Sequence, residues 1–255
     1  MIENIPDGQF ELVYLEKDMA MNLSRPIQGG QDFWRIVAPS GEGVSKMSAS
    51  FPVGGVIKRL LDVAIVILIC VPFSVLFVGL IVMMKVTDRG PVFYGHKRIG
   101  FNGRHFSCWK FRTMVVNGDE ILDAYLNENP EQREIWLRER KLEQDPRVTP
   151  IGRVLRKLSL DELPQLYNVL RGDMSIVGPR PVVLDELNNY ATSRQHYLSA
   201  RPGVTGLWQV SGRSDTTYRE RVKLDRYYVS NWNALLDIWI LLRTVPAVLA
   251  SRGAC

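Results

Sequence analysis

Cysteine is scarce in this chain. The three cysteines, Cys70, Cys108 and Cys255, form neither a CxxC pair nor a Cys/His spacing typical of zinc ligands. An odd number without paired spacing argues against a disulfide framework and against a structural zinc site. A reducing, cytosolic environment is therefore the simpler expectation.

Several familiar signatures are missing as well. The chain has no internal repeat, no GxxxxGK[ST] phosphate loop and no dinucleotide-binding GxGxxG. Its long apolar segment is not a signal peptide, because it starts more than fifty residues in and does not follow a short basic stretch. Residues 1–52 mix Gly, Ser and Pro with scattered acids and show no sustained period, so we expect a mobile extension with little chemistry.

Charge is nearly balanced, with a small basic excess. Lys and Arg total 32 against 27 Asp and Glu, which gives a net charge of +5 and a pI near 9.1. This excess fits an acidic partner, namely nucleic acid, anionic lipid or a phosphorylated substrate, and the sign alone does not choose among them. With 255 residues, 46% of them hydrophobic, the chain is long enough for one catalytic domain with a real core.

One long apolar segment stands out. Val63–Met84 contains no charged residue, and about 22 residues at 1.5 Å each would reach roughly 33 Å as a helix, enough to cross a bilayer core. A buried core helix is the alternative, but the length of the run favours entry into a membrane.

The flanks of this segment leave two topologies open. Pro72 removes a helical hydrogen bond near the middle, and the Ser74 hydroxyl is placed to serve a freed carbonyl. Length favours a span, whereas two half-helices that enter and leave on one face would suit the charges better. We predict this re-entrant form because basic residues stand on both sides: Lys58 and Arg59 before the segment, and Lys85, Arg89, Lys97 and Arg98 after it.

A second membrane contact is predicted near the C-terminus. Residues 231–253 are apolar but interrupted by Asp237, Arg243 and Pro246, which is too polar for a span. The pattern suits a helix lying in the interface, with Trp232 and Trp239 at headgroup level. A core helix packed on the domain is an equally good interpretation.

Between these segments we expect a small β-hairpin and two helices. Val92–Tyr94 and Arg104–Phe111 alternate like strands, with glycine turns at Gly95, Gly100 and Gly103. Residues 118–146 are expected to form two amphipathic helices broken at Pro130, either a cover over the active region or a partner surface. The glycine turns of residues 201–214 suit a loop that holds phosphate or nucleotide. The basic residues of this hairpin are expected to meet lipid headgroups or substrate phosphate, with a solvated basic face as the alternative: Lys97, Arg98, Lys110 and Arg112.

The segment Leu155–Pro181 places two adjacent carboxylates, Asp161 and Glu162, among basic residues. Such a pair can hold a divalent cation or attack phosphorus, and arginines bind phosphate in a bidentate manner. A structural alternative is that Asp161 caps the helix ELPQLYNVL, or that Ser159 and Glu162 form a capping box. The excess of basic residues favours catalysis over capping alone: Arg156, Lys157, Arg171 and Arg180.

The order of motifs resembles the bacterial sugar transferases, the monotopic polyprenyl-phosphate hexose-1-phosphate transferases. The resemblance covers about residues 55 to 252 and rests on KRLLD, DRGPVFY, KRIG, WKFRTM, the long block DPRVTPIGRVLRKLSLDELPQLYNVLRGDMSIVGPRP and RPGVTGLWQVSGR. Within that family the chain is similar to the short galactose-1-phosphate transferases that initiate exopolysaccharide synthesis. The implied fold is α+β and mainly helical: a membrane-embedded re-entrant helix over residues 53–88 and a cytosolic catalytic domain over 89–255, with a small hairpin and interfacial amphipathic helices.

The resemblance also implies roles for single residues. Asp161 matches the nucleophile that attacks the β-phosphate of a UDP-sugar, expels UMP and forms a phosphosugar ester, and Glu162 matches its assisting neighbour. Mg²⁺ would be bound near Asp161, and Pro72 would mark the helix break, although Val71 stands where many members have serine before that proline. Phosphate or nucleotide contacts would come from arginines: Arg156 near the active centre and, as weaker candidates, Arg112, Arg180, Arg201 and Arg213.

The implied partners are a UDP-sugar, undecaprenyl phosphate, the lipid bilayer and downstream glycosyltransferases, with no nucleic acid. The implied location is the bacterial cytoplasmic membrane, with the active site on the cytosolic face. No residue identifies the sugar; galactose is preferred over glucose through overall likeness. Two other functions stay open at this point: a membrane-associated UDP-sugar hydrolase, and a non-catalytic adaptor that binds anionic lipid.

Overall fold

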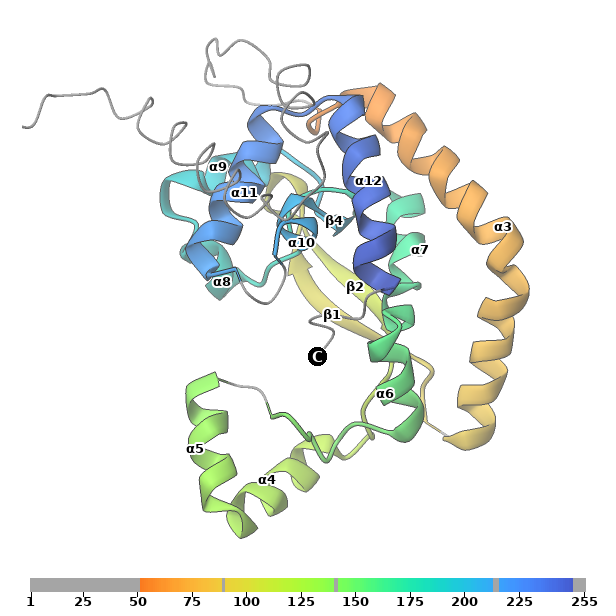
Figure 1. Ribbon diagram of the computed structural model, residues 1–255, viewed down its shortest axis with the longest axis vertical. Coiled ribbons are helices and arrows are strands. Elements are labelled where there is room, and N and C mark those ends of the chain that lie inside the picture. The colour runs from red at the N-terminus through yellow and green to blue at the C-terminus, as the bar shows by residue number, and fades with distance from the viewer. Residues whose placement is uncertain (1–50, 89, 140–141, 213–215, 250–255) are drawn as a thin grey trace, which may run out of the picture.

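The computed structural model describes residues 51–88, 90–139, 142–212 and 216–249. Almost all of the predicted extension 1–52, together with Arg213 and Cys255, lies outside these ranges. The described part is mainly helical with two small sheets, as the α+β prediction requires (Figure 1). Its elements are α3 (Gly55–Thr87), β1 (Phe93–Ile99), η1 (Phe101–Gly103), β2 (His105–Phe111), α4 (Gly118–Glu128), α5 (Pro130–Glu139), α6 (Pro150–Lys157), η2 (Leu160–Glu162), α7 (Gln165–Arg171), β3 (Ser175–Val177), α8 (Leu184–Asn188), η3 (Ala191–Ser193), α9 (Arg194–Leu198), β4 (Gly203–Thr205), α10 (Leu207–Val210), α11 (Tyr218–Ser230) and α12 (Ala234–Leu249).

The predicted hairpin is present as antiparallel strands β1 and β2. The prediction of a turn at Gly95 is wrong, because this residue pairs with Trp109 inside the ladder. A Cβ at Gly95 would come within 3.1 Å of the Trp109 ring, so glycine here makes room for an aromatic side chain rather than a turn. The chain turns at η1, where Asn102 adopts a positive φ of 54°. A second sheet, the parallel pair β3 and β4, was not predicted.

Helix α3 runs unbroken for 33 residues through Pro72. The prediction of two separate half-helices is therefore wrong at the level of the backbone, although Figure 1 shows α3 bending near its middle, where proline removes a hydrogen bond. The Ser74 hydroxyl donates to the Val71 carbonyl at 2.9 Å. Among the described residues, α3 is the one helix long and apolar enough to cross a membrane.

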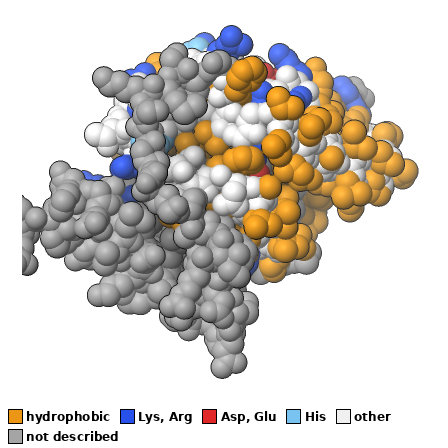
Figure 2. Space-filling view, turned by 90° about the horizontal axis from the view of Figure 1, so that it is seen from above, with side chains coloured by type: hydrophobic (Ala, Val, Ile, Leu, Met, Phe, Trp, Pro, Cys, Tyr) orange, Lys and Arg blue, Asp and Glu red, His pale blue; other side chains and the backbone are white. Residues whose placement is uncertain are grey.

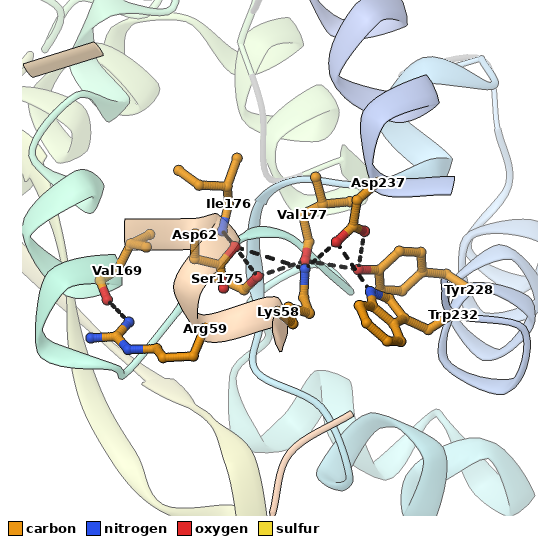
Figure 3. A network of polar contacts seen from close by, with 10 residues as sticks. All are labelled: Lys58, Arg59, Asp62, Val169, Ser175, Ile176, Val177, Tyr228, Trp232 and Asp237. Carbon is orange, nitrogen blue, oxygen red and sulfur yellow. Dashed lines mark hydrogen bonds and ion pairs between the residues drawn. The ribbon is translucent and has the colours of Figure 1, made fainter. Parts of the chain in front are cut away.

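The first turns of α3 are fixed to the body by a buried ion pair (Figure 3). Lys58 Nζ lies 2.7 Å from the Asp237 carboxylate of α12. Asp237 also accepts hydrogen bonds from Tyr228 at 2.7 Å and from Trp232 at 3.1 Å. One turn further on, Asp62 accepts from the Ser175 hydroxyl and from a backbone amide of β3. These contacts join α3, α11, α12 and β3 in one polar network.

The last turns of α3 return to the same body. Leu80 and Met84 are buried against Val92, Phe111 and Leu155, which come from the hairpin and α6. Between Val66 and Leu80, no side chain of α3 is fully buried. Figure 2 shows hydrophobic side chains gathered over the side of the molecule where α3 lies. The helix is therefore anchored at both ends, with an exposed apolar middle.

Helix α12 has two different faces. Leu236 and Ile240 are buried in the main core, which also receives Val66 of α3 and Val169 of α7. The opposite face exposes Leu235, Ile238, Leu242 and Val245. Asp237, which interrupts the apolar pattern, is the buried partner of Lys58. The core-helix interpretation thus holds for one face, and the interfacial interpretation stays a prediction for the other.

The break at Pro130 is confirmed, since α4 ends at Glu128 and α5 begins at Pro130. The first helix has the predicted extent, whereas the second is shorter than predicted: α5 ends at Glu139, and residues 142–146 are not helical. Leu122 and Leu126 of α4 pack with Leu142 in a small cluster of their own. In Figure 1, α4 and α5 project away from the body that holds α7, α11 and α12.

We predict that Lys58→Met destabilises the protein by roughly 3 to 5 kcal/mol, because it leaves the Asp237 carboxylate buried without its cation. Thermal unfolding in detergent micelles measures the effect. Lys85→Met, at an exposed position of the same helix, is the matched control and should change the unfolding temperature little. Adding Asp237→Asn to Lys58→Met should recover part of the loss. Equal stabilities for Lys58→Met and Lys85→Met would contradict this role for the ion pair.

Candidate active site

Asp161 and Glu162 lie on the short turn η2, between α6 and α7. The residue before this turn, Ser159, adopts a left-handed φ of 55°. Both capping predictions are wrong. Ser159 makes no side-chain cap, and α7 begins only at Gln165, after Pro164, which makes no side-chain cap either. The two carboxylates stand on this short 3-10 turn, which begins after the left-handed Ser159, rather than at the start of α7.

Glu162 is held by a lysine of the hairpin. Lys110 Nζ on β2 lies 2.6 Å from Glu162 Oε1, and the side chains of both residues are about one-third exposed, at 34% and 33%. Burial lowers the pKa of Lys110, but the charge of Glu162 and its hydrogen bond outweigh burial and raise this pKa above its ordinary value. Lys110 was predicted to meet phosphate or headgroups; its pairing with Glu162 was not predicted.

The electrostatic surroundings of Asp161 are mixed. Burial raises the pKa of its carboxyl; Lys110 lowers this pKa, Glu162 raises it and Arg156 lowers it, with a raised pKa as the result. In the structure, Lys110 and Arg156 are the groups that favour ionisation of this carboxylate.

Arg156 is the predicted arginine that the structure brings to the acidic pair. Its Nε donates to the Thr113 hydroxyl at 2.9 Å, which ties α6 to the chain after β2. The start of α6 is fixed by Thr149, whose hydroxyl accepts from the Gly152 amide at 2.9 Å. Gly152 has to be glycine, since a Cβ there would come within 2.1 Å of the Thr113 carbonyl oxygen. This close approach sets where Arg156 points.

The other predicted arginines have different places. Arg112 pairs with Asp88 at 2.9 Å and also bonds backbone carbonyls around the turn after α3. Arg201 Nε donates to the Gly172 carbonyl at 2.8 Å, just beyond α7. Both thus hold backbone segments together, whereas Arg180 stacks over the Trp208 ring at 5.1 Å, with Arg221 at 5.0 Å from the same ring. Arg213 lies outside the described residues.

Helix α7, which follows the acidic turn, is positioned by two residues that sequence reasoning did not single out for this task. Asn168, fully buried, donates to the Ser107 carbonyl and accepts from the Trp109 amide, which fixes α7 to β2. Arg59 of α3 donates to two carbonyls at the end of α7, those of Val169 and Leu170. A cation at a helix C-terminus is favourable, and this general rule was the only available signal for Arg59.

Magnesium is an expectation from the resemblance, and in the described part of the chain it would have to be shared with substrate. No group of three or more His, Cys, Asp or Glu side chains gathers as a ligand set in the described part of the chain. Mg²⁺ is commonly held by one or two carboxylates together with substrate phosphates. Because Lys110 already occupies one oxygen of Glu162, Asp161 is the residue that would hold the ion, which would neutralise phosphate charge.

A family model described as bacterial sugar transferase matches residues 53–251, which include α3, the acidic turn and α12. The chain belongs to the bacterial sugar transferase family. The resemblance seen in its motifs is thereby confirmed.

Three relatives illustrate the range within the bacterial sugar transferases. The exopolysaccharide production protein ExoY of Sinorhizobium fredii is 55% identical over 203 residues, which cover 80% of this chain and 90% of ExoY. The undecaprenyl-phosphate galactose phosphotransferase of Salmonella typhimurium is 51% identical over 199 residues, 78% of this chain and 41% of that protein. The UDP-galactose-lipid carrier transferase of Erwinia amylovora is 51% identical over 175 residues, 69% of this chain and 37% of that protein.

A buried carboxylate supports the GPRP segment, residues 178–181, of this bacterial sugar transferase. Asp225 of α11 accepts from the Arg180 amide at 3.2 Å and from the Tyr190 hydroxyl at 2.8 Å, both on Oδ2. Its Oδ1 has no hydrogen-bond partner among the residues that the structure describes. Burial raises the pKa of Asp225 to about 7, against the lowering effect of Tyr190 and Arg180. The folded protein therefore binds this proton more tightly than the unfolded chain does.

Asp225 should make the stability fall as pH rises. A raised carboxyl pKa contributes stability that is complete below the unfolded pKa near 4 and is lost as pH rises toward about 7. We expect the wild type to lose roughly 3 kcal/mol from this group between pH 5 and 8, and Asp225→Asn to show a flatter profile. Unfolding midpoints across this pH range measure the difference. The exposed Asp185→Asn serves as control, and parallel profiles for Asp225→Asn and the wild type would contradict the account.

Proposed function

We propose that this phosphotransferase moves galactose-1-phosphate from a UDP-sugar to undecaprenyl phosphate, as the first membrane step of exopolysaccharide synthesis. The observation that carries the proposal is the position of the acidic pair. Asp161 and Glu162 stand on a rigid turn beside Lys110 and Arg156, in a body to which both ends of the apolar helix α3 are attached. A soluble phosphate and a lipid-borne phosphate would meet at such a turn.

In the first step, an Asp161 carboxylate oxygen attacks the β-phosphorus of the UDP-sugar. A new phosphorus–oxygen bond forms, the bond from this phosphorus to the bridging oxygen breaks, and UMP leaves with the electron pair of that bond. The enzyme then carries sugar-1-phosphate on Asp161 as a mixed anhydride. The attack needs the ionised carboxylate, which Lys110 and Arg156 favour against the effect of burial.

In the second step, an oxygen of the undecaprenyl phosphate attacks the same phosphorus. The bond to Asp161 breaks, the carboxylate is restored, and undecaprenyl-diphospho-sugar is the product. Arg156 is placed to stabilise negative charge on the transferred phosphoryl group, and Lys110 keeps Glu162 in a fixed position beside it. A bound Mg²⁺ would add neutralisation of the diphosphate.

We propose that α3 is re-entrant. A helix of 33 residues at 1.5 Å each is roughly 50 Å long if straight, yet its first turns bind α12 and β3 and its last turns pack on the hairpin and α6. A spanning helix would carry one of these ends to the far side of the bilayer. The bend near Pro72 lets the exposed apolar middle dip into the membrane while both ends stay with the catalytic body on the cytosolic face.

Other helices offer apolar surface to the same membrane. Besides α3 and α12, exposed hydrophobic side chains lie on α6, at the residue that follows it, and on α7: Val154, Leu158, Tyr167 and Leu170. Helices that lie flat in the interface present one such face to lipid. This arrangement would keep the acidic turn, which joins α6 to α7, close to the headgroup layer.

The sugar is proposed from the relatives. Galactose appears in the names of the Salmonella and Erwinia proteins, each 51% identical to this chain. ExoY, which aligns over 203 residues, is named for exopolysaccharide production. In such a pathway, glycosyltransferases that extend the lipid-linked sugar would act after this enzyme. Glucose is the alternative donor.

The transfer is tested with UDP-galactose labelled in its β-phosphate. We expect label to attach to the protein at Asp161 without lipid, to move into lipid when undecaprenyl phosphate is added, and UMP to be released. Asp161→Asn should abolish labelling and transfer, whereas the exposed Asp185→Asn should behave like the wild type. A parallel series with UDP-glucose tests the sugar.

Three outcomes would count against the proposal. Full transfer by Asp161→Asn would remove this residue as the nucleophile. Release of free galactose-1-phosphate at equal rates with and without lipid would indicate a hydrolase. Binding of the protein to anionic vesicles without any release of UMP would indicate an adaptor.

A further inference from the structure

A small pocket opens beside Glu162, where α12 passes the acidic turn. Its volume is about 150 Å³, and its walls come from η2, α7, β4, α10 and α12. Most of the wall is apolar and is contributed by Leu163, Leu166, Val204, Val210 and Ala247. An apolar cavity of about this volume is large enough for a molecule such as benzene.

Two hydroxyl groups in the wall, those of Thr205 and Thr244, have already used their protons. The Thr244 hydroxyl donates to the Ile240 carbonyl at 2.8 Å, so the 2.8 Å contact between Thr205 and Thr244 has Thr205 as its donor. Gln209 donates from its side-chain amide to the Val204 carbonyl at 3.3 Å. The remaining polar wall residues are Ser159, Glu162 and Gln209. Since most of the wall is apolar, hydrocarbon fits it at less cost in desolvation than a polar nucleobase would.

The pocket also lies next to the apolar surface of the molecule. Two of its walls belong to α7 and α12, and both helices expose large hydrophobic side chains close to the pocket residues: Tyr167 and Leu170 on α7, Leu242 and Val245 on α12. The pocket is also lined by Glu162, which is adjacent to Asp161 in the sequence. It therefore connects a surface suited to lipid with the acidic pair.

We propose that this pocket binds the isoprene unit next to the phosphate of the lipid acceptor. The inference rests on the proposed function. The five-carbon unit fills an apolar cavity of this size, while its phosphate extends toward Asp161. The pocket thereby selects a polyprenyl phosphate over a free phosphate or a phosphate on a polar headgroup, because only the former brings hydrocarbon directly to the phosphate oxygen.

The test separates the two half-reactions. Ala247→Phe places a ring in the pocket from α12, and we expect the KM for undecaprenyl phosphate to rise at least about tenfold, since apolar burial is lost. Exchange of labelled UMP into UDP-galactose without lipid reports the first half-reaction alone, and its KM for UDP-galactose should stay within about twofold of the wild type. Ile238→Phe, on the exposed face of the same helix and away from the pocket residues Thr244 and Ala247, is the matched control and should leave the acceptor KM within about twofold.

The results have distinct meanings. An unchanged acceptor KM in Ala247→Phe, with an active wild type, would overturn the pocket assignment while leaving the proposed function standing. A raised KM for UDP-galactose in the exchange reaction would assign the pocket to the nucleotide and also overturn it. A wild type that neither exchanges nor transfers would overturn the proposed function and this inference together.

Cross-linking on the wild type does not depend on how the variant folds. A polyprenyl phosphate with a diazirine on its first isoprene unit should label peptides of α7 and α12 that contain Leu166 and Ala247. Competition by undecaprenyl phosphate, but not by inorganic phosphate, should remove the label. Labelling confined to α3 or to α4 and α5 would contradict the proposal.

Discussion

The attachment of both ends of α3 to one body is the constraint on which the rest of the structure depends. At one end the attachment is electrostatic, through the buried pair of Lys58 and Asp237, and at the other it is apolar packing around Met84. The long apolar middle belongs to neither end and stays exposed. On the proposed re-entrant topology, a helix held in this way fixes the depth of the catalytic body at the membrane, because the body could not move away from the bilayer without exposing that middle to water.

The same helix takes part in the active site. Arg59, one residue after the buried lysine, binds the carbonyls at the end of α7, and Asn168 of α7 binds the hairpin strand that also carries Lys110. The acidic turn lies between α6 and α7, so its place follows from these contacts. We infer that neighbouring residues of α3 do both tasks: Lys58 fixes the membrane helix to the body, and Arg59 helps to orient the turn that carries the carboxylates.

Local patterns carried much of the sequence prediction. The apolar run, the hairpin and the break at Pro130 depend on neighbours in sequence, and they are present in the structure. The predicted capping box of Ser159 and Glu162 does not form. Ser159 has a left-handed φ, and the Glu162 carboxylate binds Lys110 instead. Asp225 and the second sheet could not be foreseen, since the partners of such groups lie far along the chain. The reaction was predicted from the whole set of motifs and not from any single residue. That Arg112 and Arg201 hold backbone segments together could be seen only in the folded structure.

The most direct test of the account asks on which side of the membrane the two ends of α3 lie. Phe51→Cys and Lys85→Cys, both at exposed positions, are introduced singly after Cys70, Cys108 and Cys255 have been replaced. An impermeant maleimide is then applied to inverted inner-membrane vesicles and to spheroplasts. The account predicts that both cysteines are labelled in inverted vesicles and neither in spheroplasts. Labelling of one end from each side would show a spanning helix and contradict it.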